Sequence, residues 1–404
     1  MLHIDGGSAE ALRALAAVAA ALVVAATMVV TARLAGRIPA TIAGLTMATV
    51  GGSPFIESFT LSGELLASVL AVVSLLAFVV YLERGSLRWL LVAGLLTGCA
   101  VLVKQSAFDA GAAAAVYLVW TRRRAGIVPA AALVAAAFVP VVVAALSAPS
   151  FHDWWYAMVT YRDQADSILT GSLHERLDQA RASLGPAAKG LGVLALVAAL
   201  GWRRWPLLGV LWLAFAMLGV LGGGNFHNHY YQQMVPPLAL LAGIGGAALV
   251  RDRSRPALAL VGVALAVTVA YTAPLWFDSP TAQAKTVFPS DPHLQTDAAV
   301  IRYVRAHTRP GQRIFVMWAA ADIYYLSDRE PSFRYMWFRN IQAIPAALGQ
   351  ARRMLSGPRP PVLVVEIDSP GSMDASGATA RILASRYRLA ATVEGVPVYA
   401  PRGG

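Results

Sequence analysis

Residues 61–124, LSGELLASVLAVVSLLAFVVYLERGSLRWLLVAGLLTGCAVLVKQSAFDAGAAAAVYLVWTRRR, decide the fold of this chain. Three predominantly apolar stretches, 61–82, 87–103 and 106–121, are separated first by a loop with arginines and then by a loop that holds only Lys104. A second arginine-rich loop follows the third stretch. Apolar runs of about this length are typical of transmembrane helices, so the segment predicts a chain that crosses a bilayer back and forth.

The same pattern fills the first 276 residues. Hydropathy predicts about ten spans, near residues 11–32, 39–52, 61–82, 87–103, 106–121, 127–147, 186–201, 205–221, 231–250 and 256–276. Alternate loops carry the arginines, namely Arg33, Arg37, Arg84, Arg88, Arg122, Arg123, Arg124, Arg203, Arg204, Arg251, Arg253 and Arg255. The positive-inside rule places these loops in the cytoplasm.

The composition agrees with a polytopic α-helical membrane protein. Of the 404 residues, 57% are hydrophobic and only 14% are charged, and the mean hydropathy is +0.58. Soluble domains carry fewer apolar and more charged residues. The net charge of +11 requires no nucleic-acid partner, because the predicted cytoplasmic arginines face anionic lipid headgroups. Cys99 is the single cysteine, so no intramolecular disulfide forms.

The chain divides into two predicted domains: a transmembrane domain of residues 1–277, and a small α/β domain of residues 278–404. In the second domain, Thr296 is expected to cap a helix that runs to Thr308, and 313–319 and 361–368 are expected to be strands. Residues 388–393 and 396–400 should form a hairpin around Glu394-Gly395. With the arginine loops inside, the second domain is expected to be extracytoplasmic.

Residues 149–189 form a long outward loop in this topology. Ser172 and Glu175 have the spacing of a capping box, and an apolar stripe follows, formed by Leu173, Leu177, Ala180 and Leu184. The pattern predicts a short amphipathic helix on the outer surface. Such a helix either packs against the domain or shapes a groove for an acceptor.

Two groups of polar residues interrupt the apolar sequence at the outer face, where each polar group costs free energy. The turn 53–58 carries Glu57, and Glu64 follows about two helical turns later. Glu57 is either an ordinary loop acid or a catalytic carboxylate. Lys104 and Gln105 stand between two apolar stretches that are barely long enough for two spans. Lys104 either extends to the interface or, with Gln105, binds an anion such as phosphate.

A third polar group, 222–233 (GGGNFHNHYYQQ), precedes the span at 231–250. His227 and His229 resemble half of a metal site, but two histidines at this spacing are a weak signal. Hydrogen bonding to an anionic or hydroxyl-rich ligand, or simple loop polarity, are the alternatives. The acids Glu366 and Asp368 are read as polarity at a strand end, so the sequence contains no convincing metal-ligand set.

These three groups resemble motifs of integral-membrane glycosyltransferases with the GT-C architecture, and most closely those of the protein-mannosyltransferase and aminoarabinose-transferase group. The resemblance lies in 53–59, in 93–107 (AGLLTGCAVLVKQSA) and in 227–243 (HNHYYQQMVPPLALLAG). Such enzymes take a sugar from a polyprenyl-phosphate-linked donor at the outer side of the membrane, and many carry a soluble carboxy-terminal domain.

The resemblance implies a role for each polar group. Lys104 and Gln105 would contact the donor phosphate, and Glu57 would line the sugar cavity. Apart from the resemblance, Glu57 is the one candidate base that the sequence offers. The remaining implied residues, which would line the donor and sugar site, are His227, His229 and Tyr230. Trp318, Tyr324 and Tyr325 resemble the stretch that follows the first strand of the outer domain.

The chain departs from this family at its start. These enzymes place an acidic catalytic residue in a first outer loop, after a first transmembrane helix, and Asp5 has no matching context. The amino end is also expected to lie outside without an export signal. Both features lead us to expect an amino-truncated or mis-started enzyme, or a related partner without catalysis.

The sequence therefore predicts sugar transfer from a polyprenyl-phosphate donor to a glycan, lipid or protein acceptor at the outer face of the plasma membrane. A divalent metal could assist as a Lewis acid. A transporter or lipid flippase is the alternative from another class, although no internal repeat is evident. A non-catalytic membrane scaffold is the third reading.

Overall fold

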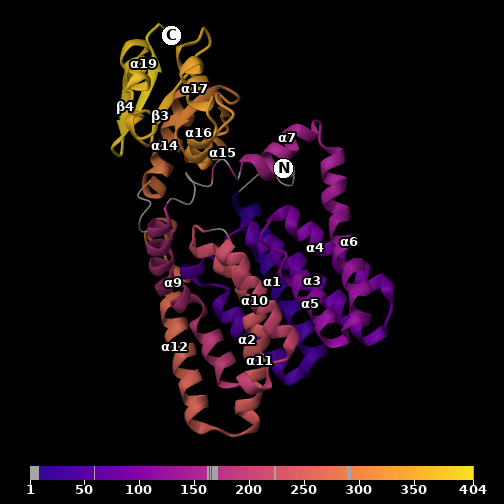
Figure 1. Ribbon diagram of the computed structural model, residues 1–404. Helices are drawn as coiled ribbons and strands as arrows, with labels where there is room; N and C mark the ends of the chain where they lie inside the picture. Colours follow the sequence, from indigo (N-terminus) through magenta and orange to yellow (C-terminus); the bar gives the residue numbers. More distant parts are fainter. Residues whose placement is uncertain are drawn as a thin grey trace. The chain divides into compact units, whose positions relative to one another are not determined.

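The computed structural model describes residues 9–58, 60–161, 163, 165, 172–222, 224–288 and 293–403. The chain folds into two compact units. The first comprises Met1–Trp154 and Ser172–Phe277, and the second comprises Trp155–Gly171 and Asp278–Gly404. The first unit is helical throughout its described part, whereas the second contains the sheet (Figure 1).

Every stretch predicted to span the membrane contains a helix. The helices of the first unit are α1 (Ala9–Ala35), α2 (Arg37–Val50), α3 (Gly63–Arg84), α4 (Leu87–Val103), α5 (Asp109–Arg122), α6 (Arg124–Ser147), α9 (Leu173–Leu200), α10 (Leu207–Gly222), α11 (Val235–Arg251) and α12 (Arg255–Phe277). The shorter α7 (Phe151–Trp155) follows α6, and the 3-10 helices η2 (Pro54–Ile56), η4 (Trp202–Arg204) and η5 (Asn228–Met234) connect longer helices.

Six of these helical segments are long and apolar enough to cross a membrane: α1, α3, α6, α9, η5 together with α11, and α12. Helices α4 and α10 are apolar but shorter, and α2 and α5 have 14 residues each. The predicted polytopic membrane class is confirmed. The number of crossings stays a prediction, because several helices fall short of the ~20 residues of a full span.

Helix α9 differs from the prediction. A separate short amphipathic helix and a later span at 186–201 were expected, but one continuous helix of 28 residues runs from Leu173 to Leu200. Proline at position 186 removes one backbone hydrogen bond and does not end the helix. The predicted capping box at Ser172 and Glu175 is confirmed, and Leu173, Leu177 and Leu184 are exposed.

Helix α11 lies at the centre of the first unit, and every residue from Val235 to Leu249 is buried. Glycines allow its neighbours to approach. A Cβ atom on Gly243 would lie 2.3 Å from the carbonyl oxygen of Pro39 in α2, and one on Gly245 would lie 2.1 Å from that of Val197 in α9. Small residues of this kind permit close backbone contact between membrane helices.

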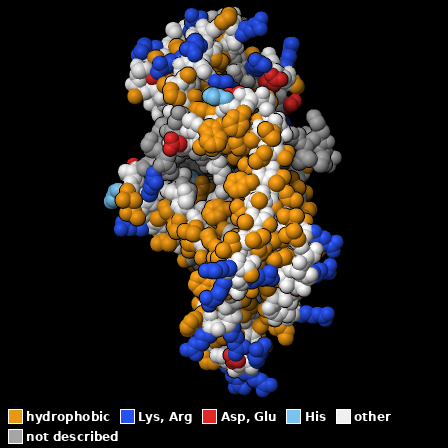
Figure 2. All heavy atoms as spheres, turned by 45° about the vertical axis from the view of Figure 1, so that its right-hand side comes forward, with side chains coloured by type: hydrophobic (Ala, Val, Ile, Leu, Met, Phe, Trp, Pro, Cys, Tyr) orange, Lys and Arg blue, Asp and Glu red, His pale blue; other side chains and the backbone are white. Residues whose placement is uncertain are grey.

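The arginine loops meet at one end of the first unit. Arg33 at the end of α1 pairs with Glu83 of α3 at 2.5 Å, and Arg204 of η4 pairs with Asp252 after α11 at 3.3 Å. Lysine and arginine side chains gather at the lower end of this unit, below a broad apolar surface (Figure 2). The positive-inside rule assigns such an arginine-rich end to the cytoplasm. The cytoplasmic location of this end remains a prediction.

The second unit is built around a five-stranded mixed sheet of order β2-β1-β3-β5-β4. Its strands are β1 (Arg313–Met317), β2 (Glu330–Pro331), β3 (Val364–Glu366), β4 (Tyr387–Val393) and β5 (Val396–Pro401). β1 is parallel to β2 and β3, whereas β5 is antiparallel to β3 and β4. The predicted hairpin around Glu394-Gly395 is confirmed, and both residues have positive φ, as tight hairpin turns require.

Helices cover both faces of this sheet. The helices of this unit are α13 (Pro280–Val287), α14 (His293–His307), α15 (Ala321–Ser327), α16 (Phe338–Ala343), α17 (Ala347–Ser356), α18 (Pro370–Met373) and α19 (Ala378–Arg386). The turn η3 (Tyr156–Thr160) lies earlier in the chain. Alternate residues of β1 enter two cores. Ile314 and Val316 pack with α14 and α15, whereas Phe315 and Met317 pack with α17, because successive strand residues point to opposite faces.

Two details of the second unit differ from the prediction. Helix α14 begins at His293, upstream of the expected cap at Thr296, since no proline or glycine separates the two positions. Strands β1 and β3 are shorter than the predicted 313–319 and 361–368. Trp318, just beyond β1, is buried, and its indole nitrogen donates to the carbonyl of Ser369 at 3.1 Å. The Tyr324 hydroxyl accepts from the Val316 amide at 2.7 Å, so both aromatic residues belong to the core of this unit, whereas Tyr325 is exposed.

Candidate active site

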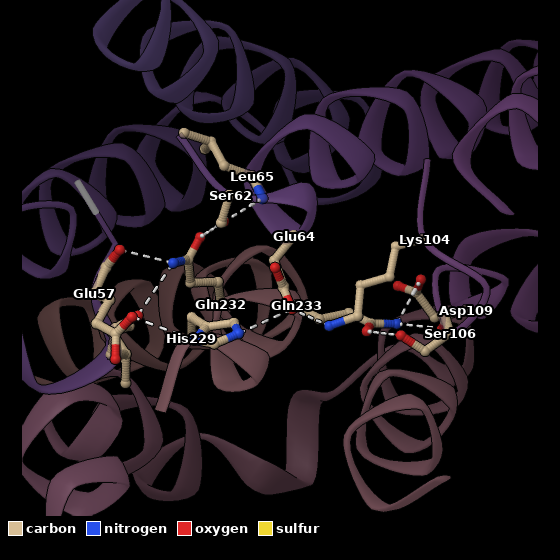
Figure 3. Close-up of polar contacts among 11 residues, drawn as sticks. Glu57, Ser62, Glu64, Leu65, Lys104, Ser106, Asp109, His229, Gln232 and Gln233 are labelled. Carbon is tan, nitrogen blue, oxygen red and sulfur yellow. Dashed lines mark hydrogen bonds and ion pairs between the residues drawn. The ribbon is translucent and has the colours of Figure 1, made fainter. Parts of the chain in front are cut away.

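Three connections meet at the end of the first unit where α3, α5 and η5 begin. The first joins α2 to α3 and carries Glu57, the second joins α4 to α5 and carries Lys104, and the third is η5 with His229. Polar contacts join Glu57, His229, Glu64 and Lys104, and a second set of contacts joins Ser106, Gln233 and Asp109 (Figure 3). Residues that are far apart in the sequence therefore share one site.

Glu57 and His229 form the first part of the network. The Nδ1 atom of His229 lies 3.2 Å from Oε2 of Glu57. Glu57 has a left-handed backbone, with φ of 51°, which a residue with a Cβ adopts only when its surroundings hold it. The amide nitrogen of Gln232 donates to the carbonyls of Ile56 at 3.1 Å and of Glu57 at 2.8 Å. Gln232 therefore fixes this turn against η5.

Glu64 and Lys104 form the second part. Glu64 lies in the first turn of α3 and is only 6% exposed, and its carboxylate forms an ion pair with Lys104, which is 21% exposed. The Lys104 ammonium also lies 3.7 Å above the ring of Tyr230. Lys104 follows the last residue of α4, and the carbonyl end of a helix favours a cation. His229 Nε2 lies 3.8 Å from Glu64 Oε1, which connects the two parts.

Asp109 forms the third part, at the start of α5, where its side chain is buried. The indole nitrogen of Trp212 donates to Oδ2 at 2.7 Å, and the side-chain amide of Gln233 donates to Oδ1 at 3.1 Å. The same Gln233 amide nitrogen donates to the carbonyl of Ser106 at 2.8 Å. A buried carboxylate with two donors is a satisfied group, and Asp109 thereby fixes the loop that presents Lys104.

A small cavity of about 10 Å³ lies between the second and third parts, lined in part by Glu64, Lys104, Asp109 and Gln233. A space of this size holds roughly one water molecule when polar groups surround it. The site is thus tightly packed, and its charged groups are held by a direct ion pair and by hydrogen bonds.

The structure brings together Glu57, Lys104, His229 and Tyr230, as the sequence analysis expected of the outer-face groups. His227 lies beside them, with its ring centroid 5.5 Å from that of His229 and 5.4 Å from that of Tyr230. Gln105 is half-buried in the Lys104 turn, and its contact with a donor phosphate stays a prediction.

Sequence reasoning missed part of this network. Glu64 was noticed but given no role, and Asp109, Gln232 and Gln233 were not singled out. Asp109 carried a usable signal, because an acid within an apolar span is costly unless it has a use. Gln232 and Gln233 carried none, since paired amides before a helix are ordinary.

The described residues contain no cluster of three or more His, Cys, Asp or Glu side chains that could hold a metal ion. Glu366 and Asp368 lie at the end of β3 in the second unit, where Asp368 is exposed to solvent. The network at the end of the first unit is therefore described by its hydrogen bonds and ion pairs alone.

Comparison with known proteins identifies the class to which the fold belongs. Residues 1–147 match the family of dolichyl-phosphate-mannose-protein mannosyltransferases. The crystal structure of ArnT from Cupriavidus metallidurans in the apo state is similar with a TM-score of 0.59 at 12% identity, covering 96% of this chain and 83% of that chain. The same protein bound to undecaprenyl phosphate is similar with a TM-score of 0.58 at 14% identity and the same coverage. No curated protein sequence matches the chain significantly.

The chain is an integral-membrane protein with the GT-C fold, which confirms the predicted architecture. The match of its first 147 residues, less than half of the chain, to the protein-mannosyltransferase family agrees with the resemblance seen in its motifs.

Proposed function

We propose that this protein is a glycosyltransferase that moves a sugar from a polyprenyl-phosphate-linked donor to a glycan, lipid or protein acceptor at the outer face of the plasma membrane. The observation that carries the proposal is the network in which the Lys104 ammonium, at the end of an apolar helix, joins Glu64, His229 and Glu57. A cation for phosphate and a carboxylate for a hydroxyl proton are the two groups that such a transfer needs.

Lys104 is the proposed phosphate-binding residue, with the neighbouring Gln105 amide as a second donor. The similarity to ArnT, a protein that has been crystallised with undecaprenyl phosphate, supports a lipid phosphate as ligand. The phosphate would share the ammonium with Glu64, which holds Lys104 in place. As the bond to the sugar breaks, Lys104 would neutralise the charge that develops on the departing polyprenyl phosphate.

Glu57 is the proposed base. The acceptor hydroxyl oxygen would attack the anomeric carbon, and the bond from that carbon to the phosphate oxygen would break. Glu57 would take the hydroxyl proton through Oε1, while His229 holds Oε2. The products are the glycosylated acceptor and the free polyprenyl phosphate. His227 and Tyr230 would line the sugar and phosphate positions beside these groups.

The proposed compartment fits this chemistry. Nucleotide sugars are made in the cytoplasm, so a site at the outer face needs a donor that the membrane itself carries. The α/β domain of residues 278–404 would lie on the same outer side, because an even number of crossings separates the chain's predicted outward start from it. A divalent metal as Lewis acid remains a prediction from the sequence.

Binding of undecaprenyl phosphate to the full chain in lipid nanodiscs tests the phosphate site, with native mass spectrometry as the readout. Lys104→Ala should weaken binding by roughly ten- to a hundredfold, since a hydrogen bond to a charged group contributes about 1.5–3 kcal/mol. Lys285→Ala is the matched control, because Lys285 is an exposed lysine of α13. The affinity of this variant for undecaprenyl phosphate should be unchanged. Equal affinity of both variants would contradict the proposed site.

Turnover distinguishes the enzyme from the other function classes. The chain is reconstituted in vesicles with lipid-linked sugars extracted from its host membranes, and release of free polyprenyl phosphate is followed by mass spectrometry. Release that Lys104→Ala abolishes, with expression intact, supports sugar transfer. Movement of intact lipid-linked sugar across the bilayer without release would instead indicate a flippase.

A further inference from the structure

The second unit presents an unusual exposed segment, residues 334–339 with the sequence RYMWFR, which follows β2 and includes the first two residues of α16. We call it the RYMWFR segment. Within the described residues 293–403, large hydrophobic side chains are exposed at Tyr325, Met336, Trp337 and Leu389. Two of these four are adjacent in this segment, where Met336 is 41% and Trp337 50% exposed.

The segment is held rigidly by the residues beside the exposed pair. Phe333 is buried, and its ring meets those of Phe315 and Tyr335 edge to face at 6.1 Å and 5.4 Å. Tyr335 and Phe338 are partly buried against the same core. Met336 and Trp337 are therefore presented on a fixed support, and little conformational entropy is lost when they bind a surface.

The surroundings of the exposed pair are basic. Arg334 lies 4.7 Å from the centre of the Tyr335 ring, and Arg339 lies 4.8 Å from that of Phe338. Residues 332–365 contain no aspartate or glutamate but carry arginine at positions 334, 339, 352, 353 and 359, of which Arg352 is paired with Asp374. This stretch therefore favours an anionic partner, because it contains no acidic residue that would repel one.

Chain connectivity keeps this surface close to a bilayer. Helix α12, which is long and apolar enough to cross a membrane, ends at Phe277, and α14 of the second unit begins at His293. The intervening residues 278–292 reach at most roughly 50 Å when fully extended. A tether of this length raises the effective concentration of lipid at the segment.

We propose that the RYMWFR segment docks on the anionic phospholipid surface of the membrane that anchors the chain. Trp337 and Met336 enter the interfacial layer, where tryptophan is enriched in membrane proteins, and the flanking guanidinium groups bind lipid phosphates, as arginine does well. The inference uses only the second unit and the membrane class of the chain, so it does not depend on the proposed transferase activity.

The test uses the full chain in a Cys99→Ser background, which removes its only cysteine. A nitroxide is attached at Met336→Cys or, as the matched control, at Leu389→Cys, an exposed apolar position on β4. Nanodiscs contain an equal mixture of phosphatidylcholine and phosphatidylglycerol. Collisions with oxygen, which is enriched in lipid, should dominate at position 336, and collisions with a water-soluble nickel complex should dominate at position 389.

Two further measurements sharpen the result. Arg334→Gln with Arg339→Gln should lower the ratio of docked to free label at position 336 by roughly thirtyfold, because each basic residue near an anionic surface contributes about 1 kcal/mol. Trp337→Ala should lower it as well. Equal nickel access at positions 336 and 389 would overturn the proposal. Immobilisation of the label by a soluble oligosaccharide, with nickel access retained, would assign the segment to a carbohydrate and also overturn it.

Discussion

The imidazole Nδ1 of His229 lies 3.2 Å from Oε2 of Glu57, although 172 residues separate them in the chain. The contact exists because η5 packs against the turn after α2, where Gln232 donates to two backbone carbonyls. One residue of this pair is an acid and the other an imidazole, two kinds of side chain that often act in proton transfer. Lys104 and Glu64 extend the same contact toward the proposed phosphate position.

Glu57→Gln should lower the turnover of sugar transfer by roughly a hundred- to ten-thousandfold, the usual contribution of a general base. The amide can still accept from His229, so the affinity for undecaprenyl phosphate should be unchanged. Released polyprenyl phosphate measures turnover, and native mass spectrometry measures binding. Glu83→Gln, at the arginine end of the unit, is the control and should retain activity. Full turnover by Glu57→Gln would assign the base to another residue.

Glu64→Gln should tighten the binding of undecaprenyl phosphate, by roughly tenfold. The substitution keeps a hydrogen-bond partner for Lys104 but removes a negative charge that competes with phosphate for it, and repulsion between such charges at short range amounts to 1 kcal/mol or more. Binding is measured in nanodiscs, again with Glu83→Gln as the control. Weaker binding by the Gln variant would mean that the Glu64 charge supports the phosphate site.

Gly243→Ala should destabilise the first unit, because the added Cβ would lie 2.3 Å from the Pro39 carbonyl oxygen and 2.9 Å from the Cβ of Ala43. Overpacking of this kind costs about 1–3 kcal/mol. Gly262→Ala in α12 is the matched control, since nothing lies within 4 Å of its Cβ position, and alanine there should stabilise the helix by about 0.4–1 kcal/mol. Thermal unfolding of the two variants in detergent should therefore shift in opposite directions. A similar shift for both would contradict the close packing of α2 and α11.

The Asp374 carboxyl should make the second unit sensitive to acid. Burial raises its pKa, but hydrogen bonds from Ser376, Thr379 and Arg352 outweigh burial and hold the pKa well below its usual range. A group whose pKa is lowered on folding stabilises the fold above its unfolded pKa of about 3.9. That stabilisation is lost as the pH falls from there through the folded pKa.

Hydrogen exchange of the α19 amides in the full chain, corrected for the intrinsic effect of pH, measures this loss. The natural protein should open increasingly below about pH 4, near the unfolded pKa of an aspartate. Asp374→Asn should be less protected at neutral pH and should show a smaller acid-dependent change. Asp328→Asn, at an exposed position, is the control. An unchanged pH profile for Asp374→Asn would show that the Asp374 contacts do not stabilise this unit.

Local sequence patterns predicted the structure correctly where residues close together in the chain determine it. The apolar stretches became helices, the Ser172 and Glu175 pair became a capping box, and Glu394-Gly395 became a hairpin turn. The continuity of α9 through Pro186 was not predicted, because a proline in a sequence marks a probable boundary, and packing decides whether the helix continues.

The sequence by itself determined that this chain spans a membrane, since hydropathy and the alternation of arginine act residue by residue along the chain. It also marked Glu57, Lys104 and His229 as costly polar groups. Only the tertiary structure decided that Glu64 pairs with Lys104 and that Asp109 is held by Trp212 and Gln233. Such contacts join helices that are distant in sequence, and their geometry is set by helix packing, which no local pattern encodes.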